Sequence, residues 1–243
     1  MSNICTIYRR ETASYFNSPI AYIFIVSFVA FLALFFFVLG NFFGQTNPDV
    51  VGYFAVMPWV FAVFVPAVTM RLWAEEKRAG TIELLMTMPL RTWQVVVGKY
   101  LAGLTVIFFS LFFTLIVPLT VSLVVNQVDW GVVFSSYVGA LLMASVYIAL
   151  GAWTSTFTQN QIVALLVAVF LSFLLAVVGT PTVINPLNGF IDGAGSFLGW
   201  FGTFYHFQSF ARGMLSLLSV IYAVSVTAFF LTLTNVFVEG RKF

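Results

Sequence analysis

Long apolar stretches alternate with short polar segments along most of the chain. About 20 apolar residues cross the hydrocarbon core as a helix, and the absence of strict period-two alternation argues against a barrel. We predict six helical spans, with ends accurate to about 2–4 residues, at residues 20–43, 53–70, 100–125, 132–153, 162–180 and 214–238. Pro58, Pro66 and Pro118 lie inside these spans and favour kinks.

The composition agrees with a single-domain, all-α integral membrane protein that occupies residues 1–243. Hydrophobic residues make up 61% of the chain and charged residues 7%, whereas about a quarter of the residues of a soluble domain are charged. Cys5 and His206 are the single cysteine and histidine, which excludes an internal disulfide and a metal cluster. A net charge of +2 without a basic patch gives no reason to expect a nucleic-acid partner.

The basic residues predict the orientation of the spans. An even number of spans places both termini on one side of the membrane. If that side is the cytoplasm, nine of the ten basic residues lie inside and only Arg212 lies outside, as the positive-inside rule requires. We therefore expect both termini in the cytoplasm.

The first 18 residues carry a helical pattern of their own. Ile4, Ile7, Tyr8 and Tyr15 recur on one face, while Arg9 and Arg10 lie on another. This pattern predicts an amphipathic helix in the headgroup region of the membrane. An ordinary basic flank of the first span is the alternative.

Residues 181–210 differ from the other connections because they combine glycines with many aromatic side chains. The segment is too apolar for a solvated linker and too rich in glycine for a straight span. We expect short helical or re-entrant elements at the outer face of the membrane, since such backbone needs cover by protein or a wet cavity. A loose loop with interfacial aromatic residues is the alternative.

The region of residues 71–92, called here the charged elbow, concentrates charge between the second and third spans. We expect the second helix to continue through residues 71–79, with Leu72 and Trp73 near the interface and the four charged residues 75–78 in water. Gly80 can adopt the left-handed conformation that ends helices.

A second short helix is expected to follow within the charged elbow. Thr81 would cap it, Glu83 would lie in its first turn beside the positive end of the helix dipole, and Pro89 would end it. Thr92 would cap the next helix, which enters the third span. The alternative is a solvated loop with the usual positive bias.

No motif for nucleotide binding accompanies the Gly98-Lys99 pair. A phosphate-binding loop needs a second glycine five residues before its Gly-Lys pair, and Ser or Thr directly after it. Trp93 and Tyr100 occupy those positions. The chain therefore lacks the residues to hydrolyse ATP by itself.

Other functional classes receive little support. An intramembrane serine protease would need a serine beside a histidine base, but His206 lies near Ser209 in a segment expected at the outer interface, where it is better explained as a packing residue. A proton-coupled carrier would need charges at mid-membrane depth, and the spans contain essentially none. We expect the chain not to be an enzyme.

The charged elbow resembles a known family. The pairs Glu75-Glu76 and Gly80-Thr81, the run at residues 83–85, Pro89, and Gly98-Lys99 before a long apolar helix resemble the signature of type 2 (ABC-2) ABC transporter permeases. More narrowly, the permease subunit of gliding-motility-type ABC exporters is similar at residues 16–20, 159–164, 206–213 and 239–243.

The resemblance implies a six-helix permease in the bacterial inner membrane, paired with a second copy of itself and surrounded by lipid. Two cytoplasmic ATPase subunits would bind ATP and magnesium, so the permease would need no cofactor, and a periplasmic auxiliary subunit is a further possible partner. Residues 1–18 would be the connecting helix, and residues 71–92 the coupling region. The implied ATPase-docking residues are Glu75, Glu76, Gly80, Thr81 and Glu83, with a second contact at Gln159 and Asn160.

Two functions stay open at this point. In the first, the chain is the membrane-spanning half of an ATP-driven exporter. In the second, the complex moves no solute and transmits force to a periplasmic or surface partner. A purely structural scaffold would have no associated ATPase.

Overall fold

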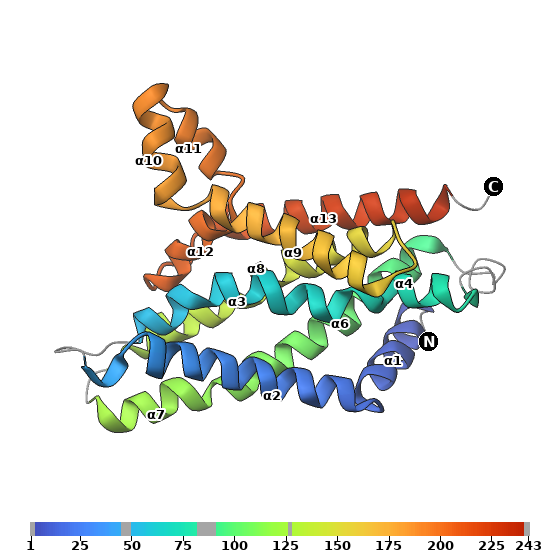
Figure 1. Cartoon of the computed structure of the whole chain (residues 1–243), viewed down its shortest axis with the longest axis horizontal. Helices are drawn as coiled ribbons and strands as arrows, with labels where there is room; N and C mark the ends of the chain where they lie inside the picture. The colour runs from blue at the N-terminus through green and yellow to red at the C-terminus, as the bar shows by residue number, and fades with distance from the viewer. Residues whose placement is uncertain (1–2, 45–49, 82–90, 126–127, 241–243) are drawn as a thin grey trace.

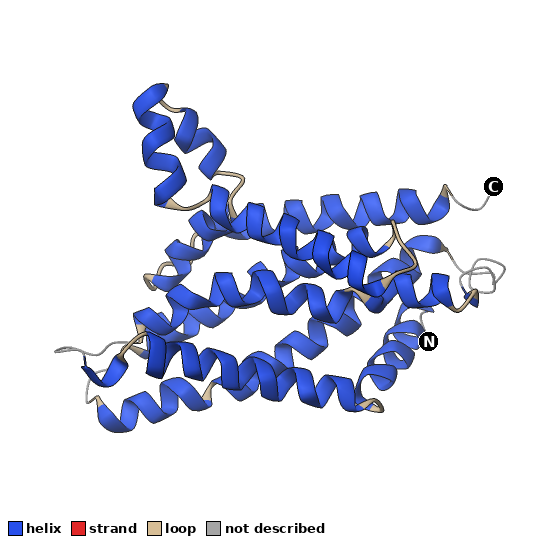
Figure 2. Cartoon of the chain, in the orientation of Figure 1, coloured by secondary structure: helices blue, strands red, loops and turns tan. Residues whose placement is uncertain are grey.

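The computed structural model describes residues 3–44, 50–81, 91–125 and 128–240 of the protein. Within these ranges the regular structure is entirely helical (Figure 2). Six helical segments are long and apolar enough to cross a membrane. The predicted fold class, an all-α membrane protein with six spans, is confirmed.

The spans are built from the following elements. The first contains α2 (Pro19–Leu34), the π-helical η1 (Phe35–Leu39) and the short 3₁₀ helix η2 (Phe42–Gly44). The second contains α3 (Val51–Thr69) and α4 (Arg71–Arg78), and the third α6 (Thr92–Thr114) and α7 (Ile116–Val124). The others are α8 (Trp130–Ser155), α9 (Gln161–Val178) and α13 (Leu217–Glu239).

Four shorter helices complete the described part of the chain. These are α1 (Asn3–Phe16), α10 (Pro181–Phe190), α11 (Ala194–Gly199) and α12 (Thr203–Ala211). The long helices run side by side, and both chain ends lie at one end of the bundle, which we call the terminal end; the opposite end is the distal end (Figure 1). Helix α1 lies obliquely at the terminal end, whereas α10 and α11 stand away from the bundle (Figure 1).

Local sequence signals explain where several helices begin and break. Ser18 caps α2, with Pro19 at the first helical position, and Asp129 accepts backbone N–H groups at the start of α8. Pro118 has no N–H for the carbonyl of Thr114, and the third span breaks at Leu115. Helix α3 continues through Pro58 and Pro66 without interruption, so these two prolines do not divide the second span.

Helix α8 occupies the centre of the bundle and packs against α3, α6, α9, α12 and α13. Small residues permit this crowding, as is typical of membrane helices. A Cβ atom built on Gly151 would overlap the side chain of Thr69 on α3, and one on Gly139 would lie 2.5 Å from Cβ of Phe210 on α12. By contrast, much of the apolar surface of α2, α9 and α13 is exposed in the single chain.

The segment of residues 181–210 forms the short helices α10, α11 and α12. The ring of His206 holds this region to α13: its Nδ1 lies 3.2 Å from Oγ of Ser219, and its Nε2 lies 2.9 Å from the carbonyl oxygen of Trp200. His206 also stacks on Tyr222, with ring centroids 4.0 Å apart. Burial lowers the pKa of His206 below its ordinary value. The hydroxyl partner of His206 is Ser219 and not Ser209.

The contact between α3 and α8 can be tested at Gly151. Replacing Gly151 with Ala should cost about 1–3 kcal/mol of stability, because the added methyl group overlaps Thr69. Thermal unfolding of the purified protein in detergent would measure the loss. Gly189→Ala is the matched control, because the added Cβ meets no described atom within 4 Å apart from its chain neighbours and the backbone of its own helix. Equal melting temperatures for the two variants would contradict this account of the packing.

Candidate functional site

Helix α4 lies at the terminal end with one face buried and the other exposed, and we call this helix the bracket. Leu72, Trp73, Ala74 and Lys77 are buried, while Glu75 and Arg78 are exposed. The expectation that Lys77 lies in water is wrong, because its side chain is buried and only 9% exposed; Trp73 is completely buried. Glu76 is partly buried. The helix is therefore packed into the protein along its whole length.

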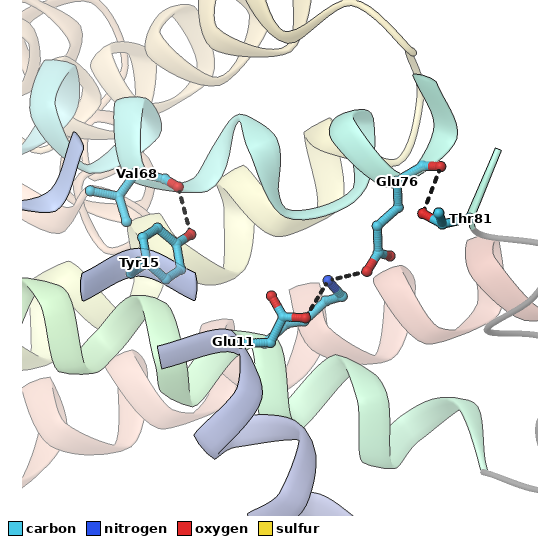
Figure 3. A network of polar contacts seen from close by, with 6 residues as sticks. Glu11, Tyr15, Val68, Glu76 and Thr81 are labelled. Atoms are coloured by element: carbon cyan, nitrogen blue, oxygen red, sulfur yellow. Dashed lines mark hydrogen bonds and ion pairs between the residues drawn. The ribbon is translucent and has the colours of Figure 1, made fainter. Parts of the chain in front are cut away.

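Lys99 is the centre of a buried ionic cluster that joins three helices. Its ammonium group donates to Oε1 of Glu76 on α4 at 2.7 Å and to Oε1 of Glu11 on α1 at 3.2 Å (Figure 3). Lys99 itself belongs to α6 and is 2% exposed. We call Glu11, Glu76 and Lys99 the Lys99 cluster.

Burial makes the Lys99 cluster a strong positional constraint. An ammonium group without a partner in an apolar interior is very costly, and the two carboxylates remove most of that cost only when they are close to it. The ammonium also lies 5.3 Å from the ring centroid of Trp73, within the range of a cation–π contact. Helices α1, α4 and α6 must therefore stay together to keep both carboxylates beside Lys99.

A glycine allows α1 to reach this position. A Cβ atom on Gly98 would lie 2.7 Å from Cγ2 of Ile7 and 3.0 Å from its Cβ. The face of α1 that carries Ile7 and Tyr15 is buried, as its sequence pattern indicates, but it packs against α6 of the protein. Glu11 lies on this same face, which brings its carboxylate to Lys99.

Tyr15 provides a second connection between α1 and the second span. Its hydroxyl donates to the carbonyl of Val68 at 2.9 Å (Figure 3). The guanidinium of Arg71 lies over the ring, 4.0 Å from its centroid. Burial raises the pKa of Tyr15 to about 12, so the hydroxyl remains a donor at any physiological pH.

A third connection joins α4 to the turn between α8 and α9. The ammonium of Lys77 donates to the carbonyl of Thr156. Asn160 in the same turn accepts the N–H of Ile162 at 2.9 Å and so caps α9. Gln159 and Asn160 are both exposed at this turn. Helix α4 is thus held on one side by the Lys99 cluster and on the other by the α8–α9 turn.

The tip of the bracket has the predicted helix stop. Gly80 has a φ angle of +69°, the left-handed conformation that a glycine adopts without strain. The hydroxyl of Thr81 donates back to the carbonyl of Glu76 at 3.4 Å (Figure 3). Both residues are exposed. Glu83, the second short helix and Pro89 lie outside the described residues.

The start of the third span differs from the prediction. Arg91 is the N-cap residue and Thr92 is the first residue of α6, so the expected cap at Thr92 is wrong. The buried hydroxyl of Thr92 has no hydrogen-bond partner among the described residues. Lys99 follows seven residues after Thr92, where it lies on the buried face of α6 with Val95, Val96 and Ala102.

Of the residues expected to couple the chain to a partner, the structure places Glu76 in the buried cluster, and Glu75, Gly80 and Thr81 on the exposed part of the bracket. Sequence reasoning did not identify Glu11 and Lys77 as members of this site. The signal for Glu11 was its position between Tyr8 and Tyr15 on the apolar face of α1, where a carboxylate needs a partner.

A sequence comparison adds an independent observation. The family model described as ABC-2 family transporter protein matches residues 45–238, which run from before α3 almost to the end of α13. The chain belongs to the ABC-2 transporter family. A comparison with curated proteins found no match. The ABC-2 assignment agrees with the resemblance found in the charged elbow, and the narrower likeness to gliding-motility permeases stays a prediction.

The Lys99 cluster of this ABC-2 protein can be tested by removing its cation. Lys99→Met should lower stability by about 3–5 kcal/mol, because it leaves two carboxylates without their counter-charge. Thermal unfolding in detergent would measure this loss. Arg78→Met, which removes an exposed cation from α4, should have little effect. Adding Glu11→Gln and Glu76→Gln to Lys99→Met should recover part of the stability, and no recovery would argue against an ionic cluster.

The close approach of α1 to α6 gives a second test in the same ABC-2 protein. Gly98→Ala should push α1 away from α6, because the stiff, β-branched Ile7 cannot move aside easily. Limited proteolysis should then cut α1 faster than in the wild type. Gly103→Ala lies on the same helix but meets only one Ile148 methyl group, at 3.3 Å. An α1 that is cut at the same rate in both variants would contradict this prediction.

Proposed function

We propose that this chain is the membrane-spanning permease subunit of an ATP-driven ABC exporter. The proposal rests on the bracket α4. This helix is the last part of the second span, is fixed to α1 and α6 by the Lys99 cluster, and leads to the exposed residues Gly80 and Thr81. Membership of the ABC-2 family supports a partner ATPase. That partner would bind ATP and magnesium, and this chain would carry out no hydrolysis.

The proposed mechanism is transmission of force through a rigid joint. An ATPase that closes on nucleotide would push the exposed tip of α4, with Glu75, Gly80 and Thr81 as contacts. The push would pass directly into α3, and through Lys99 into α6 and α1. A second contact at Gln159 and Asn160 would receive the same ATPase, because Lys77 ties α4 to that turn.

The proposed location is the bacterial cytoplasmic membrane, with the terminal end in the cytoplasm. The distribution of basic residues supports this orientation. The exposed apolar sides of α2, α9 and α13 would meet lipid and a second copy of the chain, which we propose completes the permease. A homodimer would place two brackets beneath one membrane path, one for each ATPase subunit.

One observation favours transport of an apolar or amphiphilic solute. An almost wholly apolar groove of about 400 Å³ lies between the third span and α8, with Phe108, Phe112, Leu115, Trp130 and Phe134 in its walls. Such a surface suits lipids, peptides and drugs alike.

A second candidate function, force transmission without a solute, has its own support. Helices α10 and α11 stand away from the bundle (Figure 1) and expose Phe190 and Phe197, which could contact a protein partner at the distal end. Purification of the intact complex, followed by identification of bound small molecules and proteins, would separate the two functions. Recovery of the chain without any ATPase would contradict both.

The docking role of the tip can be tested with the double variant Thr81→Ala/Glu83→Gln. It should insert into the membrane normally but bind less ATPase, by about tenfold if two hydrogen bonds are lost. Co-purification and nucleotide turnover of the complex would measure this. The matched control is Thr182→Ala/Asp192→Asn, which makes the same kind of change at exposed residues of the α10–α11 region. Equal ATPase binding by the two double variants would overturn the docking assignment.

A further inference from the structure

The α10–α11 hairpin stands away from the bundle and depends on its two ends for its position (Figure 1). No residue of α10 is buried, and the main packing partner of α10 is α11. The two helices are joined through Asn188, whose side chain bonds to the hydroxyl and to the backbone N–H of Ser196. The connection that follows α11 is therefore one of the two places where the bundle can hold this hairpin.

A pair of stacked rings holds the connection after α11. Nε2 of His206 on α12 lies 2.9 Å from the carbonyl oxygen of Trp200. The hydroxyl of Tyr222 on α13 donates to the next carbonyl, that of Phe201, at 2.6 Å. The rings of His206 and Tyr222 stack with their centroids 4.0 Å apart. Two adjacent carbonyls are thus held by two side chains that also support each other.

The partners of His206 determine which protonation state fits this place. A carbonyl oxygen only accepts, so Nε2 carries the hydrogen that bonds to Trp200. In the neutral ring Nδ1 then accepts the hydroxyl of Ser219 on α13, at 3.2 Å. A second proton on Nδ1 would reverse this bond, and the hydroxyl hydrogen of Ser219 would have to find another acceptor. The contact between α12 and α13 is therefore formed by the neutral ring.

No charged group is placed to balance a protonated His206. Helices α3, α8, α9 and α13 pack against α12. Glu239, at the far end of α13, is the single charged residue within the described bounds of these four helices. Asp192 and Arg212 flank the region, but both are exposed and neither takes part in a salt bridge among the described residues. An imidazolium at this position would be buried without a counter-ion.

The groups nearest the ring give little further stabilisation to a proton. They are the phenols of Tyr205 and Tyr222 and, beyond Thr203, that of Tyr147, and phenols stay uncharged in the range where histidine titrates. The adjoining cavity between α8, α12 and α13 has a volume of about 20 Å³, enough for about one water molecule, which cannot replace the hydration shell of a cation. Burial accordingly lowers the pKa of His206 and outweighs the opposite effect of the Trp200 carbonyl.

We propose that His206 is an acid-sensitive latch for the α10–α11 hairpin. The neutral ring holds the connection after α11 against α13, whereas a protonated ring moves out to water and releases Ser219 and the carbonyl of Trp200. The released ring binds a proton more readily than the held ring. The held state is therefore favoured most above about pH 6.5, where an unperturbed histidine titrates, and it loses stability as the pH falls below that value. The latch does not depend on an ATPase or on the orientation of the chain.

The test measures the position of the hairpin relative to α13 by electron paramagnetic resonance on the full-length chain in detergent. Spin labels at Phe190→Cys and Leu217→Cys, both exposed positions, report the distance from α10 to α13, and Cys5→Ser removes the natural thiol. Dilution with unlabelled chain restricts the measurement to distances within one copy. Lowering the pH from about 7.5 to about 5 should shift the distance distribution, with the ratio of released to held chains changing by up to about tenfold per pH unit.

Two variants identify the group that titrates. His206→Gln keeps a donor and an acceptor on a neutral side chain, so its distance distribution should not respond to pH. Asp192→Asn is the matched control, because it removes an exposed carboxylate of the same region and should respond as the wild type does. A distance that is independent of pH in the wild type would overturn the proposal. An unchanged pH response in His206→Gln, or its loss in Asp192→Asn, would do the same.

Nitrogen NMR of histidine gives a readout that needs no variant, because His206 is the single histidine of the chain. With a purification tag that contains no histidine, the spectrum should show the hydrogen on Nε2 at neutral pH. The ring should become protonated with a midpoint below about pH 6.5, in the same range as the change in distance. A ring that is charged while the hairpin is still held, or neutral after the distance has changed, would contradict the latch.

Discussion

The need to keep the charge of Lys99 paired inside an apolar bundle governs the terminal end of the molecule. The cost of burying an ammonium group exceeds the stability of most single contacts, so its two carboxylate partners are effectively obligatory. Glu11 comes from α1 and Glu76 from α4, which means that one electrostatic requirement fixes two helices against a third. Gly98 and Ile7 supply the close packing that makes the distance short enough.

Much of the fold could be predicted from the sequence because membrane spans depend on local composition. The six spans, the helix stop at Gly80 and the apolar face of α1 all follow from patterns within a few turns of chain. The errors came from tertiary contacts. Lys77 was expected in water, but it reaches the carbonyl of Thr156, 79 residues away along the sequence. The residues next to Lys77 in the sequence do not indicate that the carbonyl of Thr156 lies close by in the fold.

Only part of the candidate site could be predicted from the sequence. The motif around Glu76 and Gly80 lies at the terminal end beside the Lys99 cluster, and the ABC-2 family match agrees with the resemblance that the motif carries. The partner of Glu76 could not be chosen from sequence alone, since several basic residues lie at that end of the chain. Burial identifies the partner: Lys99 is the basic residue on the buried face of α6, where Val96 and Ala102 are also buried.

The interruption of the third span at Leu115 has a consequence for movement. On the side of the terminal end, α6 is held by an ion pair of Lys99 and by the packing of α1. On the distal side, α7 begins as a new helix, because Pro118 leaves the carbonyl of Thr114 without its usual donor. A hinge at Leu115 would allow α7 to change its angle while α6 stays in place. One membrane helix is thus divided into two segments, of which the segment at the terminal end carries the Lys99 cluster.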